Sequence, residues 1–278
     1  MEDPLMTPDP QSSAFTSTVV ADELLVEQRG PVLWLTINRE DRRNAMSHGV
    51  LAGMAEAITR AQTQREVRAI VITGVGSKAF CAGADLQSSK PFTTDYSEPM
   101  GHLAQLLRVA QMSHVPLIAR VNGACMAGGM GLMSMCDMAV SARHAVFGLP
   151  EVKIGLFPAQ VLSVLQHLIP RRVLAEMCLT GEPITAMQAR EFNLVNYVQA
   201  EDEADVDARL SWLLNRLLDK SPAAIRRGRY TMKKIEAMAF EESMSFTESQ
   251  IALFTLSDDA KEGQAAFREK RKPNWTGH

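Results

Sequence analysis

The glycine-rich segment 121–132 constrains the fold of this chain more than any other part of it. An apolar run at 115–121 leads into it, and the pattern predicts a strand that ends there and a helix that begins among the glycines. The first backbone N–H groups of a helix have no partner within the helix, and glycine lets a ligand oxygen approach them closely. Because the helix dipole is positive at this end, Gly128 and Gly129 are candidates for binding a negatively charged oxygen.

A second segment of small residues, 79–86, follows another apolar run at 67–73. Two separated loops of this kind can each offer one backbone N–H to the same oxygen atom. Fixed N–H donors that stabilise a developing negative oxygen are often a large term in catalysis. The sequence therefore predicts an oxyanion hole shared by the two segments. For each segment alone, a tight turn or close helix packing also explains the glycines.

Strand and helix patterns alternate through the first half of the chain. Residues 24–27 and 32–37 indicate a strand pair, and Ser47 is placed to cap a helix. The apolar positions of that helix have the 3.6-residue spacing: Leu51, Met54, Ile58 and Ala61. The run at 67–73 is typical of a parallel strand covered on both faces. Strand and helix recur at least three times, which predicts an α/β fold built from a βαβ series.

The second half of the chain is predicted to be mainly helical. Helical patterns dominate from residue 159 onward, apart from a brief apolar segment at 194–198. Long amphipathic helices are expected at 206–218, from Pro222, and at 238–256.

A relaxed G-x-G-x-x-G/A match at 74–79 raises the alternative of a dinucleotide-binding fold. That fingerprint must open a helix that receives the pyrophosphate, whereas this match leads into the small-residue segment 79–86. We therefore do not expect a nicotinamide cofactor. The six histidines show no metal-ligand spacing with cysteines or acids, so no metal site is predicted, and no G-x-S-x-G nucleophile motif occurs.

Composition excludes several classes of partner. A net charge of −3 provides no basic surface for nucleic acid, and no apolar run reaches the roughly 20 residues that span a membrane. The four cysteines lie in apolar or glycine-rich contexts, which favours reduced thiols in a cytoplasmic protein. Residues 1–20 are predicted to form a disordered arm, and the polar residues 87–100 a mobile segment beside the first glycine loop.

Five short motifs, in this order and spacing, resemble the crotonase (enoyl-CoA hydratase/isomerase) superfamily: 38–45, 79–86, 121–137, 150–158 and 180–184. The resemblance implies a spiral of ββα units with a two-layer sheet core at 21–200. It implies a helical C-terminal region at 201–278, which packs against neighbouring subunits in a homotrimer or a dimer of trimers. It also implies an acyl-CoA thioester substrate, with no cofactor beyond the coenzyme A that the substrate carries.

The resemblance maps an oxyanion hole for the thioester oxygen onto the backbone N–H groups of Ala84 and Gly128. Ala82 matches a position whose carbonyl accepts a hydrogen bond from the adenine amino group in relatives. Arg43 lies in the loop that borders the CoA nucleotide, where it is either a phosphate contact or a solvated loop residue. The further substrate-binding positions implied by these motifs are Gly83, Asp85, Gly129 and Gly131.

Glu151 is the candidate acid/base side chain. It lies in an otherwise apolar run between Phe147 and Leu156, where loss of solvation raises the pKa of a carboxyl group toward the range useful for proton transfer. A glutamate in such a run is otherwise solvated or paired with a cation such as Lys153. The Pro-Glu-Val context and the interval from the glycine cluster resemble those of the family's second glutamate, which favours the catalytic interpretation.

Gly131 departs from the family pattern, because two-carboxylate hydratases carry a glutamate at the matching position. The chain is then a hydratase that uses Glu151 with help from another group, a Δ3,Δ2-enoyl-CoA isomerase with one base, or a non-catalytic acyl-CoA-binding member. The pair Gly131-Leu132, together with 151–156, resembles branches that act on branched or glutaconyl-type enoyl-CoAs. An enoyl-CoA hydratase is therefore the predicted function.

An aromatic residue and a basic cluster occur together at 265–273, near the C-terminus. In relatives this tail approaches the CoA of a neighbouring subunit. The resemblance makes Phe267 a contact for the acyl or pantetheine portion and Lys270 a contact for a phosphate. A basic terminal run is otherwise simply solvated.

Overall fold

The computed structural model describes residues 22–86, 97, 99–199 and 203–278. The predicted arm at 1–20 and most of the segment 87–100 therefore lie outside the described residues. Among the helices that the structure describes, none has both the length and the apolar character that a membrane crossing requires.

The larger layer of the core is a six-stranded sheet in the order β1 (Leu24–Arg29), β2 (Val32–Ile37), β3 (Ala69–Gly74), β5 (Leu117–Val121), β7 (Met138–Ala142) and β10 (Tyr197–Gln199). β1 and β2 pair antiparallel as the predicted strand pair. The later neighbours in this order are all parallel pairs. β3 and β5 are buried along their whole length, as expected for parallel strands covered on both faces.

The smaller layer is a four-stranded sheet of β4 (Ala79–Cys81), β6 (Ala124–Met126), β8 (Val146–Gly148) and β9 (Ile184–Thr185). β4, β6 and β8 run parallel, and each comes directly after a strand of the large sheet. Chain order thus places one strand in each sheet before the chain turns into a helix or a 3-10 turn. This repeat confirms the predicted spiral of ββα units.

Helices complete each turn of the spiral and cover the core. The first are α1 (His48–Ala61), α2 (His102–Met112) and α3 (Gly128–Ser134). The other short elements are the 3-10 turns η1 (Glu40–Arg42) and η2 (Pro150–Ile154), followed by α4 (Ala159–Leu165), α5 (Arg171–Thr180) and α6 (Ala186–Glu191).

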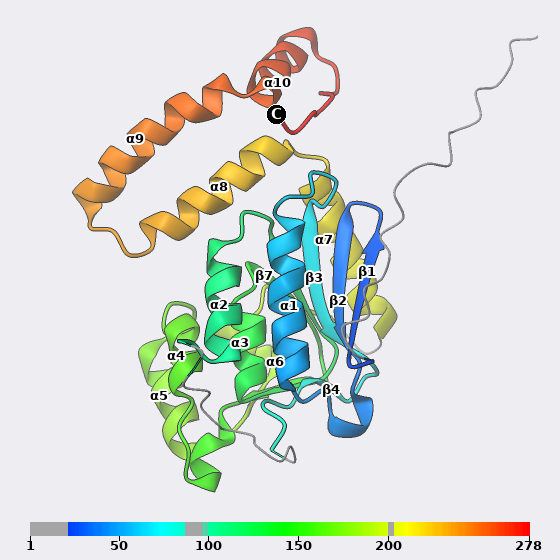
Figure 1. The fold of residues 1–278 in the computed structure, drawn as a ribbon, viewed down its shortest axis with the longest axis vertical. Helices are drawn as coiled ribbons and strands as arrows, with labels where there is room; N and C mark the ends of the chain where they lie inside the picture. The colour runs from blue at the N-terminus through cyan, green and yellow to red at the C-terminus, as the bar shows by residue number, and fades with distance from the viewer. Residues whose placement is uncertain (1–21, 87–96, 98, 200–202) are drawn as a thin grey trace, which may run out of the picture.

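The large sheet buries both of its faces. Leu33, Leu35 and Ile37 of β2 join the main core beneath α1, α2 and α3. Val32 lies in a second cluster, beneath α7 (Glu203–Leu218), because side chains alternate between the faces of a strand. Figure 1 shows α1 and α7 on opposite sides of the sheet. α7 thus packs on the sheet of its own chain. It falls within the range 201–278, for which the resemblance implies packing against neighbouring subunits.

Two local predictions can be compared directly with the structure. Ser47 caps α1 as expected, because its side chain accepts a hydrogen bond of 3.2 Å from the Val50 amide. The glycine match at 74–79 connects β3 to β4, and no helix starts there. The geometry of a dinucleotide fingerprint is therefore missing at this position.

The remaining helices project from the core. They are α8 (Pro222–Ile235), α9 (Phe240–Leu256) and α10 (Asp258–Glu269), and Figure 1 shows α9 and α10 extending beyond the sheet layers. Several large apolar side chains on these helices are exposed: Met232, Phe240, Met244, Ile251, Leu253, Leu256 and Phe267. The projecting helices therefore present an apolar surface that their own chain does not cover.

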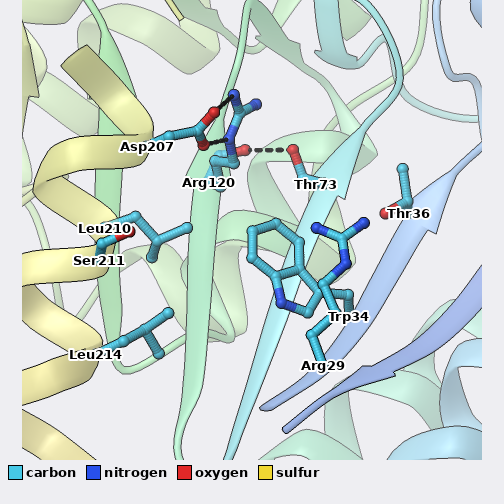
Figure 2. Close-up of a pocket in the computed structure, with 9 residues that line it drawn as sticks. All are labelled: Arg29, Trp34, Thr36, Thr73, Arg120, Asp207, Leu210, Ser211 and Leu214. Carbon is cyan, nitrogen blue, oxygen red and sulfur yellow. Dashed lines mark hydrogen bonds and ion pairs between the residues drawn. The ribbon is translucent and has the colours of Figure 1, made fainter. Parts of the chain in front are cut away.

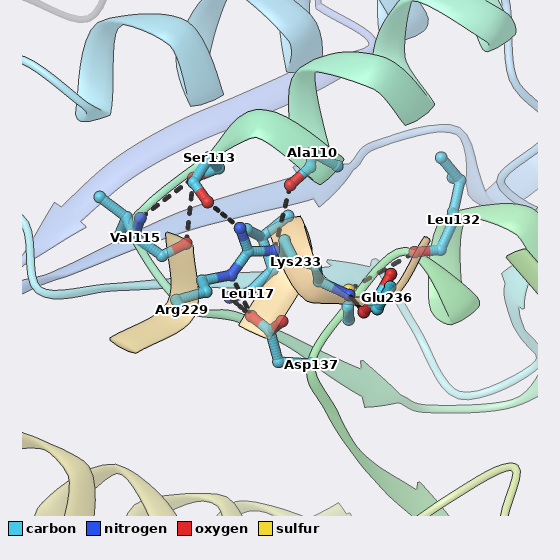
Figure 3. A network of polar contacts seen from close by, with 10 residues as sticks. Ala110, Ser113, Val115, Leu117, Leu132, Asp137, Arg229, Lys233 and Glu236 are labelled. Carbon is cyan, nitrogen blue, oxygen red and sulfur yellow. Dashed lines mark hydrogen bonds and ion pairs between the residues drawn. The ribbon is translucent and has the colours of Figure 1, made fainter. Parts of the chain in front are cut away.

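Arg229 fixes α8 to the core (Figure 3). Its Nε donates to the Asp137 carboxylate at 2.7 Å, and its terminal nitrogens donate to the carbonyls of Ala110 and Ser113. Ala110 lies in the last turn of α2 and Ser113 is its C-terminal cap, the end of a helix where carbonyl groups have fewer partners within the helix. Because only 5% of Arg229 is exposed, this one side chain holds α8 and α2 together in the interior.

Arg229→Leu is expected to lower the free energy of unfolding by about 3 kcal/mol, because it leaves Asp137 and two helix carbonyls without their cationic partner. The matched control is Gly228→Ala on the same helix, where an added Cβ meets nothing within 4 Å. That variant should be unchanged or gain up to about 1 kcal/mol. Denaturant unfolding of both proteins checks this, and a loss below about 1 kcal/mol in Arg229→Leu would contradict the assigned role.

Candidate active site

The first predicted N–H donor, Ala84, lies just after β4. The Met46 amide donates to the Gly83 carbonyl at 2.8 Å, and the Asp85 amide donates to the Met46 carbonyl at 3.0 Å. In a trans peptide the C=O and the next N–H point in opposite directions. Because the Gly83 carbonyl points toward Met46, the Ala84 N–H points away from Met46.

The second predicted donor, Gly128, is the first residue of α3. Ala127 before it has φ 51° and ψ −124°, which is unusual for a residue with a side chain. The Ala127 amide donates to the Gly148 carbonyl at 2.9 Å, and its carbonyl accepts from the Met130 amide at 2.9 Å. The same peptide-plane argument then directs the Gly128 N–H outward from the start of the helix.

The two donors are neighbours in space. A Cβ built on Gly83 would lie 3.4 Å from the Gly128 nitrogen, and one built on Gly128 would lie 3.9 Å from the Ala84 nitrogen. Within the described residues, neither amide donates to a protein acceptor. The two N–H groups therefore lie close together, and they stay candidates to donate to one oxygen atom, as an oxyanion hole requires.

Close packing beneath the loops explains further glycine and cysteine positions. A Cβ on Gly129 would lie 2.4 Å from the Cys81 carbonyl oxygen, so a larger residue cannot occupy position 129 without a backbone shift. Burial raises the pKa of the Cys81 thiol to about 12, although a contact with Gly83 opposes the effect. Cys81 is therefore a neutral thiol at physiological pH.

Glu151 lies on η2, three residues after Gly148, whose carbonyl holds Ala127 in place. Its side chain is partly buried, and its Oε2 atom is buried with no hydrogen-bond partner among the described residues. Burial raises the pKa of Glu151 above its ordinary value, partly offset by a hydrogen bond to its own backbone. Both properties suit a carboxyl group that takes and gives a proton.

The alternative of a salt bridge between Glu151 and Lys153 is not what the structure shows. The Lys153 ammonium pairs with Glu182 at 2.8 Å. The Cys178 thiol, on α5, lies close enough for the charge of Glu151 to add to the effect of burial in raising its pKa. The surroundings of Glu151 are therefore apolar or weakly polar rather than cationic.

Gly131 faces α4 rather than a polar group. A Cβ built there would lie 3.4 Å from a methyl carbon of Val161, and the three nearest atoms all belong to that side chain. Val161 itself is only 3% exposed. The surface of α4 that faces position 131 is therefore apolar.

Two other predicted contacts for the CoA nucleotide, Arg43 and Ala82, are neighbours in space. The Ala82 amide donates to the Arg43 carbonyl at 3.1 Å, so Arg43 lies next to Ala82 with an exposed side chain. Asp85 pairs with Arg39 at 2.6 Å, and a role for Arg39 was not foreseen from the sequence. The motif at 38–45 contains Arg39, but its ion-pair partners, Glu23 and Asp85, lie outside that motif.

The structure does not bring Phe267 and Lys270 to these loops. Phe267 lies on α10 and is 87% exposed. The C-terminal His278 contacts Arg65, which lies beyond the end of α1, whereas the loops lie near the start of α1. Figure 1 shows α10 and β4 at opposite ends of the molecule.

A separate cleft of about 350 Å³ lies between the outer face of the large sheet and α7 (Figure 2). Arg29, Trp34 and Arg120 are among its lining residues. None of the predicted site residues lines it, so this cleft is distinct from the glycine loops. Over the described residues, no cluster of three or more His, Cys, Asp or Glu side chains suits a metal ion.

Comparison with known proteins identifies the family of this chain. The family model described as enoyl-CoA hydratase/isomerase matches residues 27–278. Enoyl-CoA hydratase EchA19 of Mycobacterium tuberculosis is 35% identical, over 91% of this chain and 96% of that protein. The 2,3-dehydroadipyl-CoA hydratase of Escherichia coli is 31% identical, over 92% and 99% respectively.

Solved structures show the same relationship. The crystal structure of an enoyl-CoA hydratase from Mycobacterium smegmatis superposes with a TM-score of 0.85 at 31% identity, covering 92% of this chain and 99% of that one. The fold, the family model and the relatives all lead to one assignment. The chain belongs to the enoyl-CoA hydratase/isomerase family of the crotonase superfamily.

Proposed function

We propose that this protein is an enoyl-CoA hydratase that adds water across the 2,3 double bond of an acyl-CoA thioester. The observation that carries the proposal is the placement of Glu151. Its Oε2 atom is buried and has no hydrogen-bond partner in the part of the chain that the structure describes. Glu151 lies on the turn after Gly148, and the Gly148 carbonyl orients the loop that carries the Gly128 N–H. Relatives named as hydratases of enoyl-CoA and dehydroadipyl-CoA support the reaction type.

In the proposed reaction the thioester oxygen accepts hydrogen bonds from Ala84 and Gly128. Glu151 takes a proton from water as the water oxygen bonds to C3, and the electron pair of the double bond moves onto the thioester as an enolate. Glu151 then gives its proton to C2, so that one water molecule has been added. The backbone donors suit this step because they cannot be titrated and are held by the fold.

The apolar wall at Gly131 and Val161 favours one competing reaction. A Δ3,Δ2-enoyl-CoA isomerase needs only one base, which removes a proton from C2 and returns it to C4. Glu151 alone can do this, because no second carboxylate is required. The two reactions share the oxyanion hole and the base, and differ in whether water adds at C3.

An absorbance assay of the conjugated enoyl thioester distinguishes these functions. Crotonyl-CoA, 2,3-dehydroadipyl-CoA and 3-methylglutaconyl-CoA are compared with a 3-enoyl-CoA. A hydratase removes the chromophore of at least one conjugated substrate, whereas an isomerase produces it from the 3-enoyl substrate alone. A protein that binds these thioesters and turns over none of them would instead be a non-catalytic acyl-CoA-binding member.

We also propose that the CoA moiety lies beside Arg43 and the Ala82 carbonyl, and that Phe267 and Lys270 complete the site of a neighbouring subunit in a homotrimer or dimer of trimers. Two observations support this. The tail residues lie far from the loops of their own chain, and the projecting helices expose an apolar surface.

Mixed assemblies test the shared site. Phe267→Ala and Glu151→Gln are each expected to be weakly active alone, and co-assembled chains should regain activity. The reason is that some sites then combine an intact Glu151 with an intact neighbouring tail. Sedimentation measures the assembly. A monomeric protein with full activity would contradict both the oligomer and the site shared between subunits.

A further inference from the structure

Arg39 connects three segments that surround the Ala84 loop. Its Nη2 donates to the Asp85 carboxylate at 2.6 Å, its Nη1 donates to the Ala45 carbonyl at 2.6 Å, and its Nε pairs with Glu23 at 2.9 Å. The side chains of Arg39 and Asp85 are each only 11% exposed. A guanidinium group is planar and rigid, so it fixes these acceptors relative to one another.

Two of these contacts lie on either side of the hydrogen bond that orients Ala84. Met46 donates to the Gly83 carbonyl at 2.8 Å, and this bond sets the direction of the Ala84 N–H. Ala45 directly precedes Met46, and Asp85 directly follows Ala84. The Arg39 guanidinium therefore holds together the backbone segments 45–46 and 83–85. The hydrogen bonds between these two segments set the direction of the Ala84 N–H.

Charge adds to this effect. Asp85 is the residue next to the Ala84 donor, and its side chain is largely buried. Arg39 pairs with that carboxylate in a largely buried position, where unpaired charges interact strongly. Without Arg39, this carboxylate would lose its cationic partner one residue from the donor.

We propose that Arg39 is a positioning residue for the Ala84 N–H, acting through Ala45 and Asp85 without touching the substrate. The inference rests on the proposed function, since it gives Ala84 a role at the thioester oxygen. It predicts that loss of Arg39 impairs the chemical step and leaves the binding of the CoA portion largely intact.

The test compares Arg39→Met, Arg39→Lys and the control Arg120→Met. Arg120 is also nearly buried, at 7% exposure, and pairs through two nitrogens with Asp207, but it lies on the outer face of the large sheet. Its loss reproduces the removal of an arginine from an ion pair without touching the glycine loops. Thermal unfolding of all variants reports any common loss of stability.

Arg39→Met is expected to lower kcat about 100-fold, as for a displaced oxyanion donor, with KM changed by less than about threefold. Arg39→Lys should recover only part of the loss, because an ammonium group cannot reach three acceptors in one plane. Arg120→Met should keep kcat within about twofold of the wild type. Equal kcat values in Arg39→Met and Arg120→Met would overturn the inference.

A spectroscopic measurement separates this inference from the proposed function. Dimethylaminocinnamoyl-CoA is a conjugated enoyl thioester whose absorption moves to longer wavelength when its carbonyl is polarised by hydrogen bonds. At saturation the shift should be full in the wild type and in Arg120→Met, and clearly smaller in Arg39→Met. A full shift in Arg39→Met would overturn the positioning role, whereas a wild type that binds the probe with no shift would overturn the oxyanion hole itself.

Discussion

Glu151→Gln is expected to lower kcat by roughly 1,000-fold, because a positioned acid/base group contributes about 100- to 10,000-fold to a proton-transfer step. Glutamine has nearly the same shape as glutamate, so the variant should still bind acyl-CoA. The absorbance assay measures the loss, and binding of a saturated acyl-CoA shows that the site remains intact. Turnover within tenfold of the wild type would remove Glu151 from the acid/base role.

The same variant should not lose stability. Burial raises the pKa of Glu151, so between the ordinary glutamate pKa, about 4.3, and the raised value the folded protein binds more protons than the unfolded chain. The stability of the wild type therefore falls as the pH rises through this window. Glutamine removes that cost, and the melting temperature of Glu151→Gln should equal or exceed that of the wild type at pH 8.

Glu182→Gln is the matched control for this prediction. Glu182 is exposed and pairs with Lys153, two residues from Glu151, so its replacement removes a carboxylate and leaves Glu151 itself unchanged. Its kcat is expected to stay within about twofold of the wild type, and its stability to change by less than about 1 kcal/mol. A large activity loss here would indicate that general electrostatics, rather than proton transfer, explains the effect of Glu151.

Gly83→Ala is expected to have the second-largest effect, lowering kcat about 100-fold. Gly83 has φ +101°, and an added Cβ would lie 2.8 Å from the Cβ of Ala127. The added methyl group must push the two loops apart, and these loops carry the Ala84 and Gly128 donors. The strained backbone should also cost about 1–3 kcal/mol of stability.

Gly30→Ala is the control for the effect of backbone strain at a positive φ. Gly30 also has a positive φ, +57°, but an added Cβ there meets nothing within 4 Å. It should cost about 1 kcal/mol of stability and leave kcat unchanged. Steady-state kinetics and thermal unfolding check both variants, and equal activity in the two would show that the spacing of the loops does not matter to the reaction.

Much of the fold could be predicted from local patterns. The strand pair before Asn38, the Ser47 cap and the long C-terminal helices each depend on residues close in sequence, and the structure contains all of them. The short strands β4 and β6 were not separated from the glycine segments around them. Each is only three residues long, which is too short for a periodicity of two to be recognised.

The residues of the candidate site also divide into those that the sequence indicates and those that only the folded structure reveals. The two glycine-rich segments could be proposed from local patterns, whereas the resemblance to the crotonase superfamily is what selected Ala84, Gly128 and Glu151. The contacts of Met46 with Gly83, of Arg39 with Asp85, and of Val161 with the space beside Gly131 could not. Each joins residues far apart in the chain, so only the folded arrangement reveals them.

Hydrogen exchange at C2 of butyryl-CoA in deuterated water tests the central claim most directly. In the proposed mechanism, hydration and isomerisation both proceed through an enolate held by Ala84 and Gly128, with a proton moved at C2 by Glu151. The wild type is expected to introduce deuterium at C2, and Glu151→Gln to do so at least about 100-fold more slowly. Exchange at the wild-type rate in Glu151→Gln, or no exchange by a wild type that binds butyryl-CoA, would contradict the account.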